Sequence, residues 1–228
     1  MKKAFLVLLV MVLAAATLGW ADEEKKWQGF YVGINTGLAR HEPNWSDNDY
    51  DWFGATLTNP YNTILAGGTI GFNIQNGRVV MGFEFDGAFG FMENEIKYCM
   101  DTFPLPVTWD VTKTDKLEFL ITMRVRAGFA LDNALFYLTA GAGLPSAAHT
   151  WIETGDVPDS WKTFKNSNIG MALGLGFEHR LGQVLSFKAE FLSFKNQPKI
   201  EPNKKTVPYH MSVDESVGIL RIGFNIHF

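Results

Sequence analysis

Glu84 and Asp86 are the pair of residues whose type and spacing are most suggestive of chemistry in this chain. Residues two positions apart in a β-strand point to the same face, so their carboxylates would lie side by side. Paired carboxylates can act as general acid and base when one of them stays protonated. Arg124 and Arg126 are expected close by on the same face, and their charges would keep both carboxylates ionised. The sequence therefore predicts no catalytic role for this pair.

A second candidate is His210-Met211-Ser212, which places a histidine and a serine on one face of a strand. A hydrolase could use this spacing, so a lipid A-modifying enzyme stays as an alternative. No third residue is placed to orient the histidine, and we predict that the protein is not an enzyme.

Metal and cofactor sites are also not predicted. Asp47, Asp49 and Asp51 are too loosely spaced for a calcium loop. No pair of Cys or His has metal-ligand spacing, and the lone Cys99 cannot form an internal disulfide.

The start of the chain has the pattern of a secretory signal peptide. A basic segment, Met1-Lys2-Lys3, precedes the apolar run Ala4–Leu18 and the small residues around Gly19-Trp20-Ala21. The run is shorter than the roughly 20 residues of a membrane-spanning helix. We expect residues 1–21 to be cleaved after Ala21, residues 22–27 to form a periplasmic leader, and residues 28–228 to form one domain.

The mature chain is acidic. Without Lys2 and Lys3, 18 Lys and Arg stand against 24 Asp and Glu, a net charge of −6. Nucleic acid is therefore not an expected partner, because such proteins need a basic face.

The stretch Leu65–Phe91 is expected to be a β-hairpin that turns at Asn76-Gly77, through a type I′ turn with two positive φ angles. One face of the hairpin carries large apolar side chains, and the other carries glycines, small polar residues and carboxylates. A membrane barrel would turn the large face to lipid and the polar face to its lumen. A soluble sandwich would do the reverse, and the hairpin alone does not decide.

The whole chain decides for the barrel, because eight alternating segments are joined by connections that are long and short in strict turn. We therefore predict an all-β fold, an eight-stranded antiparallel up-and-down transmembrane β-barrel with four long extracellular loops and three short periplasmic turns. The long loops are expected at Arg40–Thr63, Met92–Thr114, His149–Asn166 and Asn196–Ser212.

Several strands carry a family resemblance that covers all the expected strands and none of the long loops. The matching segments are Trp27-Gln28-Gly29-Phe30-Tyr31-Val32-Gly33, Ala66-Gly67-Gly68-Thr69-Ile70-Gly71-Phe72-Asn73, Val80-Met81-Gly82-Phe83-Glu84, Met123-Arg124-Val125-Arg126-Ala127-Gly128-Phe129-Ala130, Leu135-Phe136-Tyr137-Leu138-Thr139-Ala140-Gly141 and Leu220-Arg221-Ile222-Gly223-Phe224-Asn225-Ile226-His227-Phe228. The chain resembles the small opacity-type, porin-like outer-membrane proteins of Gram-negative bacteria. The resemblance implies an eight-stranded barrel, residence in the outer membrane and no enzymatic activity. It implies no particular partner, because the loops differ.

The last strand alternates and stops on an aromatic residue, which resembles the signal that the outer-membrane assembly machinery reads by strand addition. The residues of this assembly signal are Leu220, Ile222, Phe224, Ile226 and Phe228. Phe228 would also suit the aromatic girdle at the membrane interface.

The strand parity predicts a lumen with five acidic and five basic residues. These are Glu84, Asp86, Glu118, Arg124, Arg126, Glu178, Arg180, Lys188, Glu190 and Arg221. We expect the pairs Glu84–Arg124 and Glu190–Arg221, since each pair falls at a similar depth on neighbouring strands. The parity also places Leu117 outward. Such a lumen is a plug of paired charges or a gated polar pathway, and we favour the plug.

The loops are expected to hold any partner specificity. Trp45, Tyr50, Trp52, Phe53 and Tyr61 could bind a host protein or glycan, or lie in the headgroup belt. Lys199, Lys204, Lys205 and His210 would suit lipopolysaccharide phosphates, or form a solvated loop.

We therefore predict a monomeric outer-membrane barrel with a structural, envelope-stabilising and surface-display role. Its expected partners are outer-membrane lipids, lipopolysaccharide and the assembly machinery. A small porin and an adhesin or receptor remain the alternatives.

Overall fold

The computed structural model describes residues 26–47, 56–102, 107–155, 160–196, 199–202 and 210–228. Every regular element among these residues is a β-strand. The expected signal peptide lies outside the described residues, as do Asp49, Asp51, Tyr50, Trp52, Phe53, Lys204 and Lys205. Within the described part of the chain, no helix is long and apolar enough to cross a membrane.

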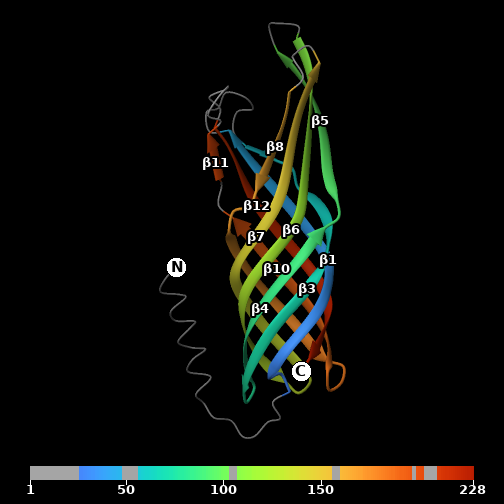
Figure 1. Ribbon diagram of the computed structural model, residues 1–228, viewed down its shortest axis with the longest axis vertical. Coiled ribbons are helices and arrows are strands. Elements are labelled where there is room, and N and C mark those ends of the chain that lie inside the picture. The colour runs from blue at the N-terminus through green and yellow to red at the C-terminus, as the bar shows by residue number, and fades with distance from the viewer. Residues whose placement is uncertain (1–25, 48–55, 103–106, 156–159, 197–198, 203–209) are drawn as a thin grey trace.

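Eight antiparallel strands pair in chain order, and the last pairs with the first, so the sheet closes into a barrel (Figure 1). Closure satisfies the backbone groups that an open edge would leave unpaired in lipid. The predicted eight-stranded antiparallel barrel is confirmed. The ring strands are β1 (Gly29–Asp47), β3 (Tyr61–Asn76), β4 (Val79–Gly90), β6 (Val107–Leu131), β7 (Ala134–Gly155), β9 (Gly170–Arg180), β10 (Leu185–Asn196) and β12 (His210–His227).

Four further strands lie in the segments expected to be loops, and this part of the prediction is wrong. They are β2 (Thr56–Thr58), β5 (Glu93–Thr102), β8 (Ser160–Asn166) and β11 (Lys199–Pro202). β5 pairs with β6 and β8 pairs with β7, so a sheet in the order β5-β6-β7-β8 continues past the barrel (Figure 1). Outside lipid, a strand needs no apolar face, so its residues lack the alternation that marked the other strands.

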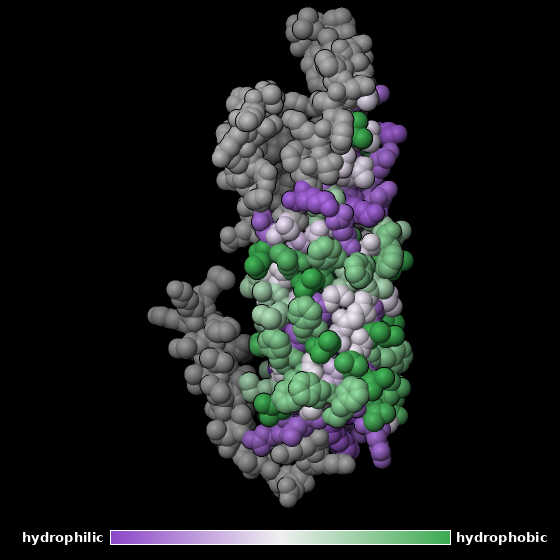
Figure 2. All heavy atoms as spheres, viewed as in Figure 1, coloured by the Kyte–Doolittle hydropathy of each residue, from purple (hydrophilic) through white to green (hydrophobic). Residues whose placement is uncertain are grey.

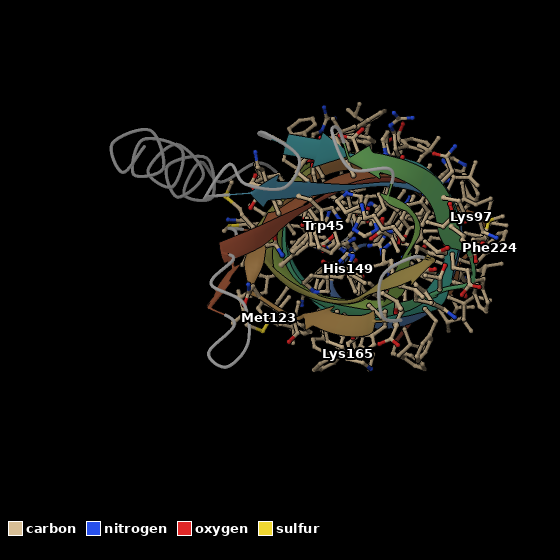
Figure 3. All side chains as sticks on the ribbon, turned by 90° about the horizontal axis from the view of Figure 1, so that it is seen from above. Trp45, Lys97, Met123, His149, Lys165 and Phe224 are labelled. Carbon is tan, nitrogen blue, oxygen red and sulfur yellow. The ribbon has the colours of Figure 1, made fainter. Side chains whose placement is uncertain are left out.

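The barrel turns its large apolar side chains outward and its charges inward. Phe30 and Ile34 on β1 are 61% and 71% exposed, whereas Arg124 on β6 is 1% exposed. These outward side chains form an apolar band with hydrophilic residues above and below it (Figure 2). Seen along the barrel, Met123 and Phe224 point away from the ring, and His149 and Trp45 point into it (Figure 3). The apolar band marks the membrane-spanning part of the barrel.

The hairpin between β3 and β4 turns one residue later than predicted. Asn76 pairs with Val79, so Gly77 and Arg78 are the central residues. Gly77 has a φ of 55°, and no positive φ occurs at Asn76 or Arg78. A positive φ at the first central residue alone is the pattern of a type II′ turn, so the type I′ prediction is wrong.

β6 contains a bulge that the alternation did not reveal. Leu117 pairs with Ala147 and Phe119 pairs with Ser146, which leaves Glu118 as an extra residue. An extra residue reverses the side-chain parity beyond it. Leu117 is therefore buried inside the barrel, and Glu118 bonds outside the lumen to Ser146 and Lys165. The predicted outward Leu117 and inward Glu118 are both wrong.

Candidate functional site

The periplasmic half of the lumen holds a charge network of four carboxylates and four cations. Its residues are Glu84, Asp86, Glu178, Glu190, Arg124, Arg126, Lys188 and Arg221, all buried. Opposite charges inside a barrel can be held without water only if they are paired and hydrogen-bonded. The equal numbers make the network neutral as a whole.

Both predicted pairs lie in contact. Glu84 is directly opposite Arg124 in the β4–β6 register, and the two side chains form an ion pair. Glu190 is opposite Arg221 in the β10–β12 register, with Arg221 Nε donating to Glu190 Oε2 at 2.7 Å.

The network also crosses the lumen, which strand pairing alone did not predict. Arg124 Nη1 on β6 donates to Glu190 Oε1 on β10 at 3.0 Å. Lys188 Nζ, also on β10, donates to Glu84 Oε2 on β4 at 3.0 Å. These bonds join opposite walls, so the network ties the barrel together across its interior.

Two tyrosines missed by the sequence analysis complete the network. Tyr31 donates to Glu84 at 2.8 Å and Tyr137 donates to Glu190 at 3.1 Å. The guanidinium of Arg126 lies 4.6 and 5.0 Å from their ring centroids. Each ring occupies the space where a Cβ would lie on a glycine of the neighbouring strand, Gly71 or Gly176. Their signal in the sequence was a tyrosine on the glycine-rich, inward parity of a strand.

The periplasmic end of the lumen is closed by Trp27, a residue assigned above to the leader. Trp27 is fully buried, and its backbone N–H donates to Gln75 Oε1 at 2.8 Å. Arg180 lies over the indole ring at 5.2 Å and donates to the Lys26 carbonyl. The indole therefore covers the end of the barrel from inside.

An apolar septum crosses the lumen above the charge network. Each of the eight ring strands contributes at least one buried apolar side chain to this layer. The inward side chains of β12 show this layering. Arg221 belongs to the charge network, Ile219 and Val217 belong to the septum, and Glu215 is a charged residue on the far side of the septum. The members are Ala39, Leu65, Ala88, Leu117, Leu120, Ala147, Ala172, Leu192, Phe194, Val217 and Ile219.

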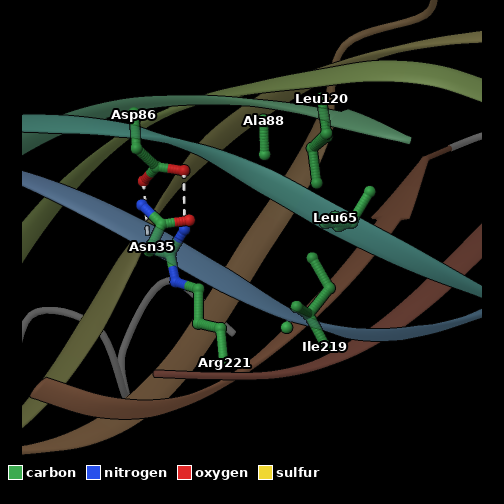
Figure 4. Close-up of a pocket in the computed structure, with 8 residues that line it drawn as sticks. Asn35, Leu65, Asp86, Ala88, Leu120, Ile219 and Arg221 are labelled. Atoms are coloured by element: carbon green, nitrogen blue, oxygen red, sulfur yellow. Dashed lines mark hydrogen bonds and ion pairs between the residues drawn. The ribbon is translucent and has the colours of Figure 1, made fainter. Parts of the chain in front are cut away.

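A cavity of about 10 Å³ lies between the charge network and the septum (Figure 4). Asp86 and Arg221 line its polar side, and Leu65, Leu120 and Ile219 line its apolar side. A space of this size holds about one water molecule. It offers no passage for a hydrated ion.

The extracellular end of the lumen holds the mouth cluster, which the sequence analysis missed. Its buried members are His41, Trp45, Tyr61, Lys113, Asp115, His149 and Glu215. At this height the outward residues are charged, such as the ion pair of Arg40 with Glu42, so the cluster lies beyond the membrane-spanning band. The bulge in β6 reverses the parity of Lys113 and Asp115 and aims them inward, which is why simple alternation did not find them.

Glu215 joins two histidines in the mouth cluster. His149 Nε2 lies 2.7 Å from Glu215 Oε1, and His41 Nε2 contacts Glu215 Oε2. His149 Nδ1 also lies 2.7 Å from Asp115 Oδ1. Lys113 Nζ lies 3.0 Å from Asp115 Oδ2 and 4.7 Å from the centroid of Trp45.

These contacts set the protonation of the cluster. Burial by itself would lower the pKa of His149, but hydrogen bonds and charges from Asp115 and Glu215 raise it to about 9. Burial would raise the pKa of Glu215, but its hydrogen bonds with His149 and His41 hold it at about 2. Burial also raises the pKa of Tyr61 and lowers that of Lys113. At neutral pH both His149 and Glu215 are therefore charged.

Trp45 and Tyr61 have neither of the locations expected for loop aromatics. Trp45 is 2% exposed and Tyr61 is 8% exposed, so they lie in the mouth rather than in the headgroup belt or on a binding surface. His210 and Ser212, the candidate hydrolase pair, lie in the first three residues of β12, where the structure describes the backbone and not these side chains. Within the described residues, no group of three or more His, Cys, Asp or Glu side chains could hold a metal ion.

The barrel has the architecture of outer-membrane proteins, and a comparison with protein families gives its family. The family of the outer membrane protein beta-barrel domain matches residues 5–212, most of the chain. The chain belongs to this family. It is a small β-barrel protein of the Gram-negative outer membrane, as the resemblance of its strands implied. A search of curated proteins found no significant match.

Solved structures similar to this chain include the outer membrane protease OmpT from Escherichia coli, at 7% identity and a TM-score of 0.53. The alignment covers 91% of this chain and 99% of OmpT. The outer membrane protein OprG from Pseudomonas aeruginosa matches at 15% identity and a TM-score of 0.47, over 88% of this chain and 97% of OprG. Neisserial surface protein A matches at 13% identity and a TM-score of 0.44, over 88% of this chain and 98% of that protein. At these identities the similarity to OmpT is one of fold alone.

Proposed function

We propose that this protein is a closed, monomeric outer-membrane barrel that stabilises the envelope and displays its extracellular strands at the cell surface. The apolar septum is the observation that carries the proposal. Ions cross a barrel through a continuous polar or water-filled path, and a layer of buried apolar side chains from all eight ring strands interrupts such a path.

The charge network supports a structural role. Arg124 and Arg221 each contact carboxylates on both β4 and β10, and Glu84 contacts cations on β6, β10 and β12. Breaking such a network to let ions pass would expose several uncompensated buried charges, each costing several kcal/mol. A gated polar pathway is therefore the weaker candidate.

The proposal assigns no catalytic activity to the barrel. Ser186 Oγ, His227 Nε2 and Glu178 Oε1 lie within 3.1 Å of one another, but all three residues are buried in the lumen. Serine and carboxylate contact the same imidazole nitrogen, so the carboxylate does not orient the histidine towards the serine as in a catalytic triad. Lipid A mass spectrometry after expression tests the enzyme alternative, and an unchanged acyl pattern supports the proposal.

Display of a surface is the second part of the proposal. The β5-β6-β7-β8 sheet extends beyond the apolar band and carries exposed charged side chains such as Glu95 and Lys97. An adhesin or receptor would use this sheet and the loops. Lipopolysaccharide phosphates would meet Lys199, Lys204, Lys205 and His210.

Deletion of the gene in its native host tests the structural role. We expect the deletion to raise uptake of a hydrophobic fluorescent dye across the outer membrane. Expression of the wild-type protein, and of a variant with residues 97–112 replaced by a short turn, should restore the barrier. An unchanged barrier in the deletion strain would contradict an envelope-stabilising role, and rescue by wild type alone would assign that role to the projecting sheet instead.

A further inference from the structure

The mouth cluster contains a histidine that its neighbours force to carry a charge. His149 Nδ1 and Nε2 each lie 2.7 Å from a carboxylate oxygen, one on Asp115 and one on Glu215. An ionised carboxylate can only accept a hydrogen bond, so both ring nitrogens must donate. The geometry is that of an imidazolium bridging β6 and β12 from its position on β7.

The other histidine of the cluster needs no charge. Tyr61 accepts a hydrogen bond from the Leu117 backbone N–H at 2.8 Å, which leaves its hydroxyl proton free to donate to His41 Nδ1 at 2.8 Å. His41 then donates from Nε2 to Glu215. A neutral imidazole satisfies both contacts, so His149 is the histidine whose protonation the geometry requires.

Charge balance in the cluster depends on His149. Lys113 and the imidazolium supply two positive charges, and Asp115 and Glu215 supply two negative charges. Loss of the His149 proton removes a positive charge that both carboxylates contact and sets a ring lone pair against a carboxylate oxygen. Both effects destabilise the contact.

The described groups that face His149 come from the strands around the mouth. β1 presents His41 and the edge of Trp45, β3 presents Tyr61, β6 presents Lys113 and Asp115, and β12 presents Glu215. From β10, Asn196 accepts a bond from the Glu215 backbone N–H at 2.6 Å. On β8, Lys165 is exposed and pairs with Glu118 outside the lumen. The cation among these groups, Lys113, is engaged by Asp115 at 3.0 Å.

We propose that His149 is a pH-sensitive latch that holds the extracellular mouth of the barrel closed at neutral and acidic pH and releases it at alkaline pH. The protonated ring links β6, β7 and β12, and through Glu215 and His41 it reaches β1. The latch lies above the septum and beyond the membrane band. Its release therefore loosens the mouth without opening the lumen, and the latch is independent of the closed-lumen function.

The direction of the pH dependence follows from the raised pKa of His149 in the folded protein. A histidine whose pKa is raised on folding contributes stability that is fully present below its unfolded value, about 6.5, and that is lost as pH rises through the folded value, about 9. For shifts of this size, closure of the mouth should weaken roughly 10- to 100-fold between pH 7 and pH 10. On the acid side, the low pKa of Glu215 keeps its charge down to about pH 2.

The test uses the mature full-length protein, labelled with ¹⁵N-histidine, in phosphatidylcholine nanodiscs. Nuclear magnetic resonance should show both ring nitrogens of His149 protonated at pH 7, with a midpoint near 9. Amide hydrogen exchange, corrected for intrinsic rates, should show loss of protection at residues 41–45 and 215–217 over the same range, while residues 123–129 stay protected. A neutral His149 at pH 7, or mouth protection that does not change with the titration, would overturn the proposal.

Two histidine variants separate the latch from a general effect of pH. In His149→Gln the amides of the mouth should be weakly protected from exchange at all pH values. They should not show the wild-type step, which is the loss of protection as pH rises through about 9. His179→Gln alters an exposed residue at the periplasmic end of β9 and should keep the wild-type step. A step that persists in His149→Gln overturns the proposal, as does a step that disappears in His179→Gln. The wild-type titration decides the question by itself if His149→Gln does not fold.

Discussion

Arg124 on β6 donates to Glu190 on β10 at 3.0 Å, although β7 and β9 lie between these two strands along the shorter way round the ring. The bond therefore runs through the lumen and not along the sheet. Together with the Lys188–Glu84 bond at 3.0 Å, it links opposite walls of the barrel directly through the charge network.

Loss of Arg124 should strongly destabilise the barrel. Arg124→Ala removes a buried cation that contacts Glu84, Asp86 and Glu190, and we expect a loss of about 3–5 kcal/mol in the free energy of unfolding. Urea titration in lipid vesicles measures it. Arg40→Ala, in an exposed pair with Glu42, is the control and should cost about 1 kcal/mol or less. Equal effects in the two variants would contradict a paired, dry network.

A methyl group at Gly176 should displace a tyrosine from the network. The Tyr137 ring occupies the space that a Cβ at Gly176 would need, and its hydroxyl donates to Glu190 at 3.1 Å. We expect Gly176→Ala to lower the free energy of unfolding by about 1–3 kcal/mol, because overpacking forces the ring to move. Gly182→Ala is the control, since a Cβ there meets no atom within 4 Å. A neutral Gly176→Ala would show that the ring is not held in place.

Deletion of Glu118 should be tolerated, unlike deletion of a neighbouring residue. Leu117 and Phe119 already pair with the consecutive residues Ala147 and Ser146, so removing Glu118 leaves all inward side chains of β6 inward. Deletion of Ile121 shifts the parity of one part of β6 against the other and should prevent folding. Circular dichroism and the gel mobility of unheated samples report on folding. The bulge is misassigned if the Glu118 deletion fails to fold and the Ile121 deletion succeeds.

The terminal Phe228 should matter for assembly more than for stability. Phe228 is 77% exposed, and its backbone N–H donates to the Phe30 carbonyl at 2.9 Å. We expect Phe228→Ala to reduce insertion into the outer membrane of cells several-fold while the purified protein still refolds into lipid. Phe91→Ala, at an outward residue that is 64% exposed, should insert like wild type. An unimpaired Phe228→Ala would remove the role of this residue as an assembly signal.

The alternation of apolar and small residues was enough to predict the ring of strands, because a period of two is a direct consequence of strand geometry. Glu84 and Asp86 were placed inward for the same reason, and they lie there. The prediction of strand ends was poorer. β1 continues to Asp47 and β12 begins at His210, where no lipid requires an apolar face.

Sequence reasoning failed where a single backbone irregularity changed the parity. The extra residue at Glu118 turns Leu117, Asp115 and Lys113 inward, and without it the septum and the mouth cluster could not be assembled from the sequence. Contacts across the lumen were also out of reach, since strand order gives neighbours in the sheet and not residues on opposite walls.

Single-channel recording is the most direct test of a closed lumen. The purified mature protein is refolded into planar lipid bilayers in potassium chloride at pH 7, and insertion is verified independently. The septum and the cross-lumen charge network predict no stepwise current at moderate voltage. Reproducible conductance steps from the wild-type protein would contradict the closed lumen and favour a small porin.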